Sequence, residues 1–178
     1  DNVDSPISLY AATKKANELM AHTYTHLYGL QTVGLRFFTV YGPWGRPDMA
    51  MWLFTEAMVN GEPIKVFNHG NMRRDFTYID DIVSGVKASL FSDQLEDCEV
   101  LNIGNNRSEK LMDMIRTIAD NLGVEPDMKM MPMQPGDVEA TYADIDRIHA
   151  KLGYRPTTPI SKGIPRFIAW YRSYHGLA

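Results

Sequence analysis

The chain of 178 residues is 44% hydrophobic and 22% charged, a balance that excludes a disordered, collagen-like or coiled-coil protein. Its length allows one domain or slightly more. With 18 Lys and Arg against 22 Asp and Glu, the net charge of −4 argues against a nucleic-acid-binding protein, because such proteins usually carry a basic surface.

Helical and strand-like segments alternate along the chain, and this alternation predicts an α/β fold. Ser5 and Pro6 suit the N-cap and first turn of a helix that ends at Gly29. Residues 31–38 (QTVGLRFF) are short, branched and aromatic, which predicts a buried strand. A loop rich in Gly and Pro follows at residues 41–48.

The remaining elements continue the alternation. Helices are expected at about 50–60, 80–91, 108–122, 144–152 and 160–174, and strands at 64–67, 76–79, 100–103 and 129–131. Asp80 and Ser108 are the expected N-caps of two of these helices, and Gly61 and Gly123 the expected ends of two. A turn-forming segment, QPGD at residues 134–137, precedes the last two helices.

A dinucleotide-binding unit normally includes a Gly-rich turn between a strand and a helix, where backbone N–H groups hold the pyrophosphate. The sequence contains no GxGxxG pattern, and its nearest pair, Gly42 and Gly45, has Pro43 between them. The chain also begins directly at a helix cap. We therefore expect it to be the carboxy-terminal portion of a larger protein.

Tyr10 and Lys14 lie one helical turn apart on one face of the first helix. Because a nearby cation stabilises a phenolate, this pair could act as a general base with a lowered pKa. The spacing alone arises by chance in many helices, so the pair needs support from other segments.

That support comes from residues 35–43 (LRFFTVYGP), which together with Tyr10 and Lys14 resemble the extended short-chain dehydrogenase/reductase superfamily, within it the NAD-dependent epimerases and dehydratases of nucleotide sugars. Three longer segments are similar to the UDP-glucuronate 4-epimerase group: 41–49 (YGPWGRPDM), 68–81 (NHGNMRRDFTYIDD) and 133–138 (MQPGDV). The resemblance covers essentially all 178 residues, but only about the second half of a family member.

The resemblance implies the carboxy-terminal part of a Rossmann-type parallel sheet with a smaller α/β substrate-binding domain, the Gly-rich first half of the Rossmann fold being absent. Residues 1–46 would belong to the NAD-binding domain, and residues 47–178 mainly to the substrate-binding domain. Within the latter, about 76–104 would return to the Rossmann sheet. The implied cofactor is NAD, the substrate a UDP-sugar, and the full-length form a homodimer.

The same resemblance assigns the chemistry. Tyr10 would take the proton of the sugar 4-hydroxyl as hydride leaves C4 for NAD⁺, and Lys14 would lower the tyrosine pKa and bind the nicotinamide ribose. Phe37 would border the nicotinamide. The 4-keto sugar would then rotate and take the hydride back on its other face, which inverts C4 and converts UDP-glucuronate to UDP-galacturonate.

The substrate-binding positions follow residue by residue. Thr39 would face the sugar, where a hydroxyl donor suits a C6 carboxylate, and galactose-type relatives usually have asparagine there. Arg46 carries a guanidinium suited to a carboxylate or a phosphate. The other matching positions are Arg74 at the diphosphate, Lys65 and Phe67 along uracil, and Gln134 and Asp137 near the diphosphate and the nucleoside ribose.

Three functions stay open at this point. The first is an epimerase, which the 41–49 and 133–138 segments favour. The second is a related UDP-sugar decarboxylase or dehydratase, whose distinguishing residues lie upstream of Tyr10. The third is a non-catalytic module that binds UDP-sugars, because a chain that does not hold NAD does not transfer hydride, and we expect these 178 residues to be inactive alone.

The cellular setting follows from what the sequence lacks. The lone Cys98 excludes an intrachain disulfide and a cysteine-based zinc site, and His22 and His26 have no third ligand, so no metal is expected. The first residues have neither the basic nor the apolar region of a signal peptide, and no apolar stretch reaches about 18 residues. We therefore expect a cytoplasmic protein without a membrane or nucleic-acid partner.

Overall fold

A computed structural model describes residues 2–177. The helices are α1 (Leu9–Tyr28), α2 (Ala50–Asn60), α3 (Ile79–Leu90), α4 (Leu111–Leu122), α5 (Asp146–Leu152) and α6 (Ile160–His175). The strands are β1 (Thr32–Phe37), β2 (Thr39–Tyr41), β3 (Ile64–Val66), β4 (Arg73–Arg74), β5 (Phe76–Tyr78), β6 (Cys98–Ile103), β7 (Glu109–Lys110) and β8 (Met128–Met130). The pairs β1–β6, β2–β5 and β3–β8 are parallel, so the predicted α/β class is confirmed, whereas β4–β7 is antiparallel.

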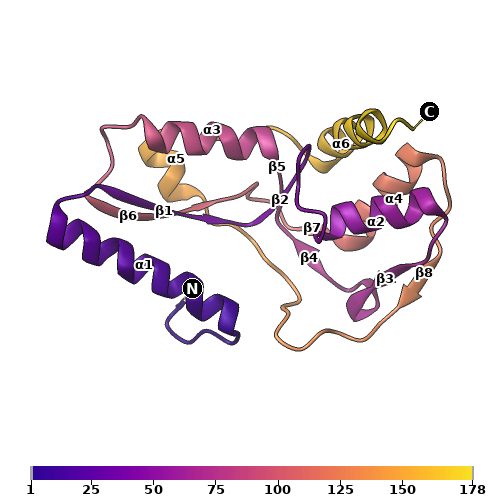
Figure 1. Cartoon of the computed structure of the whole chain (residues 1–178), viewed down its shortest axis with the longest axis horizontal. Helices are drawn as coiled ribbons and strands as arrows, with labels where there is room; N and C mark the ends of the chain where they lie inside the picture. The colour runs from indigo at the N-terminus through magenta and orange to yellow at the C-terminus, as the bar shows by residue number, and fades with distance from the viewer. Residues whose placement is uncertain (1, 178) are drawn as a thin grey trace.

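One half of the molecule is built on the β1–β6 pair, with α1 on one face and α3 and α5 on the other (Figure 1). Leu101 and Ile103 of β6 are buried in one core with Ile82 of α3 and Ile148 of α5. On the opposite face, the Arg36 Nε donates to Glu18 Oε1 of α1 at 2.6 Å. No residue of α1 is buried, and its outer face exposes apolar side chains: Leu19, Met20, Tyr24 and Leu27.

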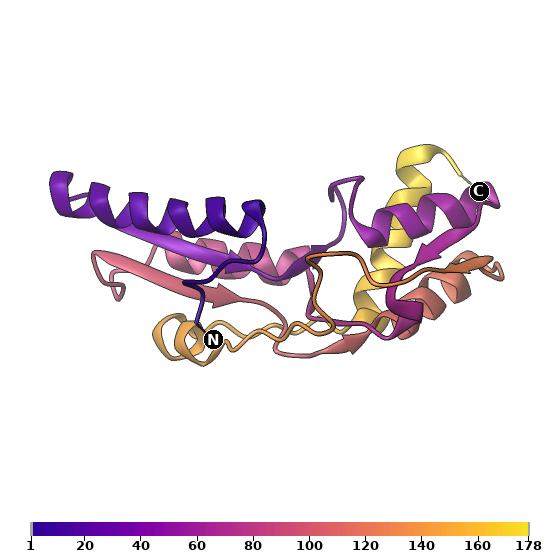
Figure 2. The ribbon, with the colours of Figure 1, turned by 90° about the horizontal axis from the view of Figure 1, so that it is seen from below.

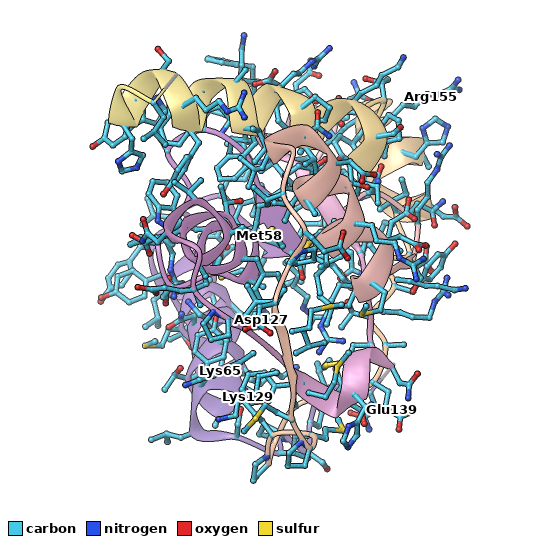
Figure 3. The ribbon with its side chains drawn as sticks, turned by 90° about the vertical axis from the view of Figure 1, so that its right-hand side faces the viewer. Met58, Lys65, Asp127, Lys129, Glu139 and Arg155 are labelled. Atoms are coloured by element: carbon cyan, nitrogen blue, oxygen red, sulfur yellow. The ribbon has the colours of Figure 1, made fainter. Side chains whose placement is uncertain are left out.

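The other half gathers α2, α4 and α6 with β3 and β8, and the two halves lie side by side along the long axis (Figures 1 and 2). Its core includes Phe54, Met58, Ile64, Ile115 and Phe167. Figure 3 views this half end on, with α6 across its top and the β3–β8 pair, marked by Lys65 and Lys129, below. Whether residue 46 divides two domains remains a prediction.

Two buried aspartates join segments that are far apart in the sequence. Asp75, fully buried before β5, accepts bonds from the Asn105 amide (2.6 Å) and the Thr77 hydroxyl (3.0 Å) at Oδ1, and from the Ala143 amide (3.1 Å) at Oδ2. Asp81 of α3 accepts the backbone amides of residues 157 and 158 at 3.1 and 2.9 Å. A buried carboxylate is destabilising unless such donors bind it. Asp75 therefore holds residues 105 and 143 beside the start of β5, and Asp81 holds residues 157 and 158 beside α3.

Helix ends follow the predictions at glycines but not at three N-caps. Gly29, Gly61 and Gly123 end α1, α2 and α4 in the left-handed conformation, as expected. The predicted cap Ser5 is wrong, because the Ser8 hydroxyl accepts the Ala11 amide at 3.1 Å and caps α1. The caps predicted at Asp80 and Ser108 are also wrong. Strands β5 and β7 run directly into α3 and α4, so the extended residues Tyr78 and Lys110 hold those positions.

Within residues 2–177, no helix combines the length and the apolar character that crossing a membrane requires.

Candidate functional site

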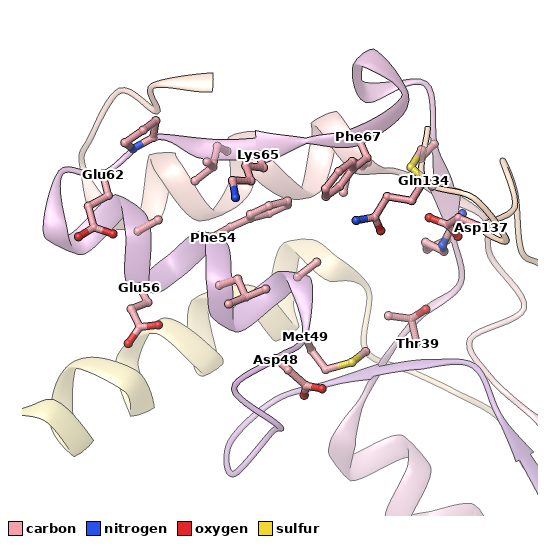
Figure 4. Close-up of a pocket in the computed structure, with 18 of the residues that line it drawn as sticks. Thr39, Asp48, Met49, Phe54, Glu56, Glu62, Lys65, Phe67, Gln134 and Asp137 are labelled. Carbon is pink, nitrogen blue, oxygen red and sulfur yellow. The ribbon is translucent and has the colours of Figure 1, made fainter. Parts of the chain in front are cut away.

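A cavity of about 700 Å³ opens between β2, α2, β3 and the loop at residues 134–137 (Figure 4). It is lined by six of the seven residues predicted to bind substrate: Thr39, Lys65, Phe67, Arg74, Gln134 and Asp137. These residues come from four separate segments, which the fold brings together. Their individual roles remain predictions.

The floor of the cavity is apolar. Phe54 of α2 is buried in the core beneath it, and Phe67 follows β3 directly, so two aromatic rings lie along one wall with Lys65 near both (Figure 4). Aromatic faces accept flat ring systems, and such a floor with a few polar groups at its rim is typical of small-molecule sites. Two carboxylates, Glu56 and Glu62, lie at the end of the cavity away from Thr39 (Figure 4).

Arg74 is held rigidly at the opposite end. Its Nη2 lies 2.6 Å from Asp137 Oδ1, and its Nη1 donates to the Arg73 and Glu139 carbonyls at 2.9 and 3.3 Å. Its backbone is fixed as well, because Arg74 pairs with Glu109 in the antiparallel β4–β7 ladder. The guanidinium therefore reaches the cavity from a two-residue strand that the sequence analysis did not predict.

A second cation, Lys65, stands on β3 directly beside Lys129 of β8, since the two are partners in the parallel register (Figure 3). Neighbouring like charges repel, and an anion bound between or near them relieves that repulsion. Lys65 and Arg74 together give the cavity positive charge at two points of its wall.

Arg46 does not line this cavity. Its guanidinium turns to Asp48 in the same loop, with Nε–Oδ1 and Nη2–Oδ2 distances of 3.0 and 2.5 Å. The hydrogen bonds of this pair lower the pKa of Asp48 and raise that of Arg46. Asp48 itself lines the cavity, so Arg46 acts on it from outside.

The three residues predicted to contact the cofactor lie on the surface of the β1–β6 half. Tyr10 is 68% exposed, and the Lys14 Nζ stands 5.4 Å from the centre of its ring. Phe37, at the carboxyl end of β1, is also exposed.

Sequence analysis missed three residues that shape the site. Met49 and Phe54 line the cavity, and Asp75 holds the backbone next to Arg74 in place. A charged residue directly before the strand-like segment Phe76–Tyr78 was the available signal for Asp75, because a carboxylate entering a buried strand needs donors. Among residues 2–177, no group of three or more His, Cys, Asp and Glu is arranged to hold a metal ion.

Residues 1–104 match the NAD dependent epimerase/dehydratase family. The chain is 49% identical, over 98% of its length, to Protein CapI of Staphylococcus aureus, of which it covers 57%. It is 45% identical to UDP-glucuronate 4-epimerase 4 of Arabidopsis thaliana, of which it covers 44%. The chain thus spans about half the length of these relatives.

Solved structures that are similar to the chain point to the same family. The UDP-glucuronic acid 4-epimerase of Bacillus cereus, in complex with UDP-glucuronic acid and NAD, superposes on 96% of the chain with a TM-score of 0.89 and 33% identity. MoeE5, in complex with the same two ligands, superposes on 98% with a TM-score of 0.90 and 31% identity. The chain covers 54% and 58% of these two proteins. The fold is therefore that of the Rossmann-type epimerases.

Proposed function

Because the chain belongs to the NAD dependent epimerase/dehydratase family, we propose that its reaction is the inversion of C4 of UDP-glucuronate to give UDP-galacturonate. The observation that carries this proposal is the cavity, in which two cations, the rings of Phe54 and Phe67, and the Thr39 hydroxyl meet. A diphosphate, a flat base and an acidic sugar are three of the four parts of a UDP-uronate, the fourth being the ribose, and each of these three has a chemical counterpart there.

The substrate would lie along the cavity with its uracil on β3, against Phe67 and Lys65, and its diphosphate at Arg74. A guanidinium donates two parallel bonds to phosphate oxygens, which suits it better than an ammonium for this role. Gln134 and Asp137 would bind near the diphosphate and the ribose. The sugar would then reach Thr39 at the start of β2, on the side of the cavity nearest to Asp48.

Tyr10 would act as the general base. Its phenol is exposed, and the Lys14 Nζ stands 5.4 Å from the centre of its ring. As the C4–H bond breaks, Tyr10 would accept the proton of the 4-hydroxyl, leaving a 4-keto sugar. After rotation of the sugar, Tyr10 would return the proton to O4 as C4 is reduced on its other face.

NAD, when bound, would supply the redox chemistry by accepting the hydride from C4 and returning it. The residues present fit one end of that cofactor, because the Tyr10 hydroxyl and the Lys14 ammonium are exposed donors suited to a ribose diol, and the Phe37 ring is exposed at the end of β1. No GxGxxG turn for the pyrophosphate occurs among the 178 residues. We therefore expect these residues to bind UDP-sugars, and hydride transfer to need further sequence.

The complete enzyme is expected to be a cytoplasmic homodimer. The exposed apolar face of α1, with Leu19, Met20 and Tyr24, supports an assembly in which that helix is covered.

Calorimetry with the 178-residue chain tests the binding part of the proposal. We expect UDP and UDP-glucuronate to bind, and UDP-glucuronate to bind more tightly than UDP-glucose. Conversion of UDP-glucuronate in the NAD-loaded complete enzyme, followed by proton NMR, tests the reaction. A product that has lost CO₂ or water would identify a decarboxylase or dehydratase instead, and binding without turnover would identify a non-catalytic module.

A further inference from the structure

Trp44 is unusual among the residues of the loop between β2 and α2. Its side chain is 76% exposed, and its backbone φ is 62°, in the left-handed region that bulky residues rarely adopt. The Gly45 amide donates to the Gly42 carbonyl at 3.2 Å, so Pro43 and Trp44 are the central residues of a tight turn. The second central position of such a turn normally takes glycine or asparagine.

The ring of Trp44 is anchored on α6. Its centre lies 5.3 Å from the rings of both Trp170 and Tyr174, which are themselves stacked at 5.1 Å one helical turn apart. Figures 1 and 2 show this loop beside α6 in both views. Aromatic rings at these separations attract each other, so the contacts offset the cost of the unfavourable backbone.

The turn leads directly into residues that line the cavity. Directly after it come Arg46 and Asp48, which pair with each other, and the Met49 amide donates to the Arg46 carbonyl at 3.2 Å. Asp48 and Met49 line the cavity, and Arg46 holds the Asp48 carboxylate from outside it. A shift of the turn would move all of them together.

We infer that Trp44 is a positioning residue, which fixes the Arg46–Asp48 segment at the sugar end of the cavity through its contact with Trp170 and Tyr174. The catalytic consequence rests on the proposed function, whereas the anchoring rests on the contacts alone. Glycine at position 44 would remove the backbone strain of the turn. The tryptophan is therefore explained by its role in placing the Arg46–Asp48 segment, and not by local stability.

The anchoring is tested without substrate, by ¹⁵N relaxation on the chain. In Trp44→Gly we expect the order parameters of the Gly45 and Met49 amides to fall from about 0.85 to below about 0.6, while those of Gly61 and Gly123 stay unchanged. Tyr174→Leu, which removes the anchor from the other side, should have the same effect. Phe91→Ala, at an equally exposed aromatic outside the loop, should have none. Unchanged order parameters in Trp44→Gly would overturn the inference.

The consequence for catalysis is tested by kinetics in the NAD-loaded complete enzyme. Trp44→Gly should lower kcat by about tenfold or more, with UDP affinity within about twofold of wild type, because the nucleotide contacts lie on other segments. Trp44→Phe should recover most of the loss, and the Trp44→Gly, Tyr174→Leu double variant should be no slower than either single variant. An unchanged kcat, or an equal fall in UDP affinity, would contradict the assignment. A wild-type enzyme without epimerase activity would refute the proposed function. The anchoring of Trp44 on α6 would then still be tested by the order parameters.

Discussion

The guanidinium of Arg74 and the carboxylate of Asp137 lie 2.6 Å apart at the rim of the cavity, so each residue is the counter-ion of the other. Both were predicted to bind the nucleotide, one at the diphosphate and one near the ribose. A bound diphosphate would compete with Asp137 for the same guanidinium and leave the carboxylate free for a sugar hydroxyl. The pair therefore holds both side chains near the positions that the proposed substrate needs.

Arg74→Ala should weaken UDP and UDP-glucuronate alike by about 1.5–3 kcal/mol, because a charge-assisted bond to the diphosphate common to both is lost. Calorimetry on the chain measures this. Arg73→Ala is the matched control, since the neighbouring guanidinium bonds Ser108 on the other side of β4. Unchanged UDP affinity in Arg74→Ala, or a loss confined to the uronate, would remove Arg74 from the diphosphate site.

Tyr10→Phe in the complete enzyme should lower kcat by about 10² to 10⁴, the usual contribution of a general acid–base group, and leave UDP affinity unchanged. Tyr28→Phe, at a similarly exposed tyrosine near the end of the same helix, should have no effect. Near-normal turnover without the Tyr10 hydroxyl would exclude it as the proton acceptor.

Selectivity for the uronate should depend on Thr39 more than on Arg46, because Thr39 lines the cavity and Arg46 is paired with Asp48 outside it. Thr39→Val should narrow the ratio of kcat/KM for UDP-glucuronate over UDP-glucose by about tenfold, or roughly 1.4 kcal/mol. Thr39→Ser, which keeps the hydroxyl, should retain the ratio. If Thr39→Val leaves it intact and Arg46→Ala narrows it, the two roles are reversed.

Asp75→Asn should destabilise the chain by about 2–4 kcal/mol, because an amide nitrogen would face one of the backbone N–H groups that the carboxylate now accepts. Urea denaturation measures the change. Asp80→Asn, exposed in the first turn of α3, should cost at most about 1 kcal/mol through the helix dipole. Equal effects of the two substitutions would contradict the role given to Asp75.

The Glu18–Arg36 pair predicts a pH dependence of stability. The hydrogen bond from Arg36 lowers the pKa of Glu18 below its ordinary value of 4.5. A carboxyl group whose pKa is lower in the folded state stabilises the fold above its unfolded pKa, and this contribution disappears as pH falls through the folded pKa. The advantage of wild type over Glu18→Gln should therefore be up to about 1 kcal/mol at pH 7 and vanish well below pH 4.5. Thermal melts across this range test it, with the exposed Glu125→Gln as control, and an advantage that grows in acid would contradict it.

Local signals in the sequence were sufficient for most elements. Helix α2 has the predicted limits, because its apolar residues recur at helical spacing and Gly61 supplies a left-handed end. The β4–β7 ladder could not be predicted, since each strand has two residues and its partner lies about 35 positions away in the chain. The sequence motifs identified Arg74 and Asp137 as site residues. Their ion pair could not be predicted, because it also joins segments that are far apart in the chain.

The three bonds of Asp75 also bear on the order in which the chain acquires its structure. One carboxylate links residue 75 to residues 105 and 143, so this joint cannot be completed until nearly all of the chain has left the ribosome. Until residue 143 has emerged, β1 and β6 can pair, but the later segment that packs over them is still missing. A nascent chain stalled before residue 143 would lack the Ala143 donor of Asp75 and also Ile148 of α5, so Leu101 and Ile103 of β6 would stay partly uncovered and available to chaperones.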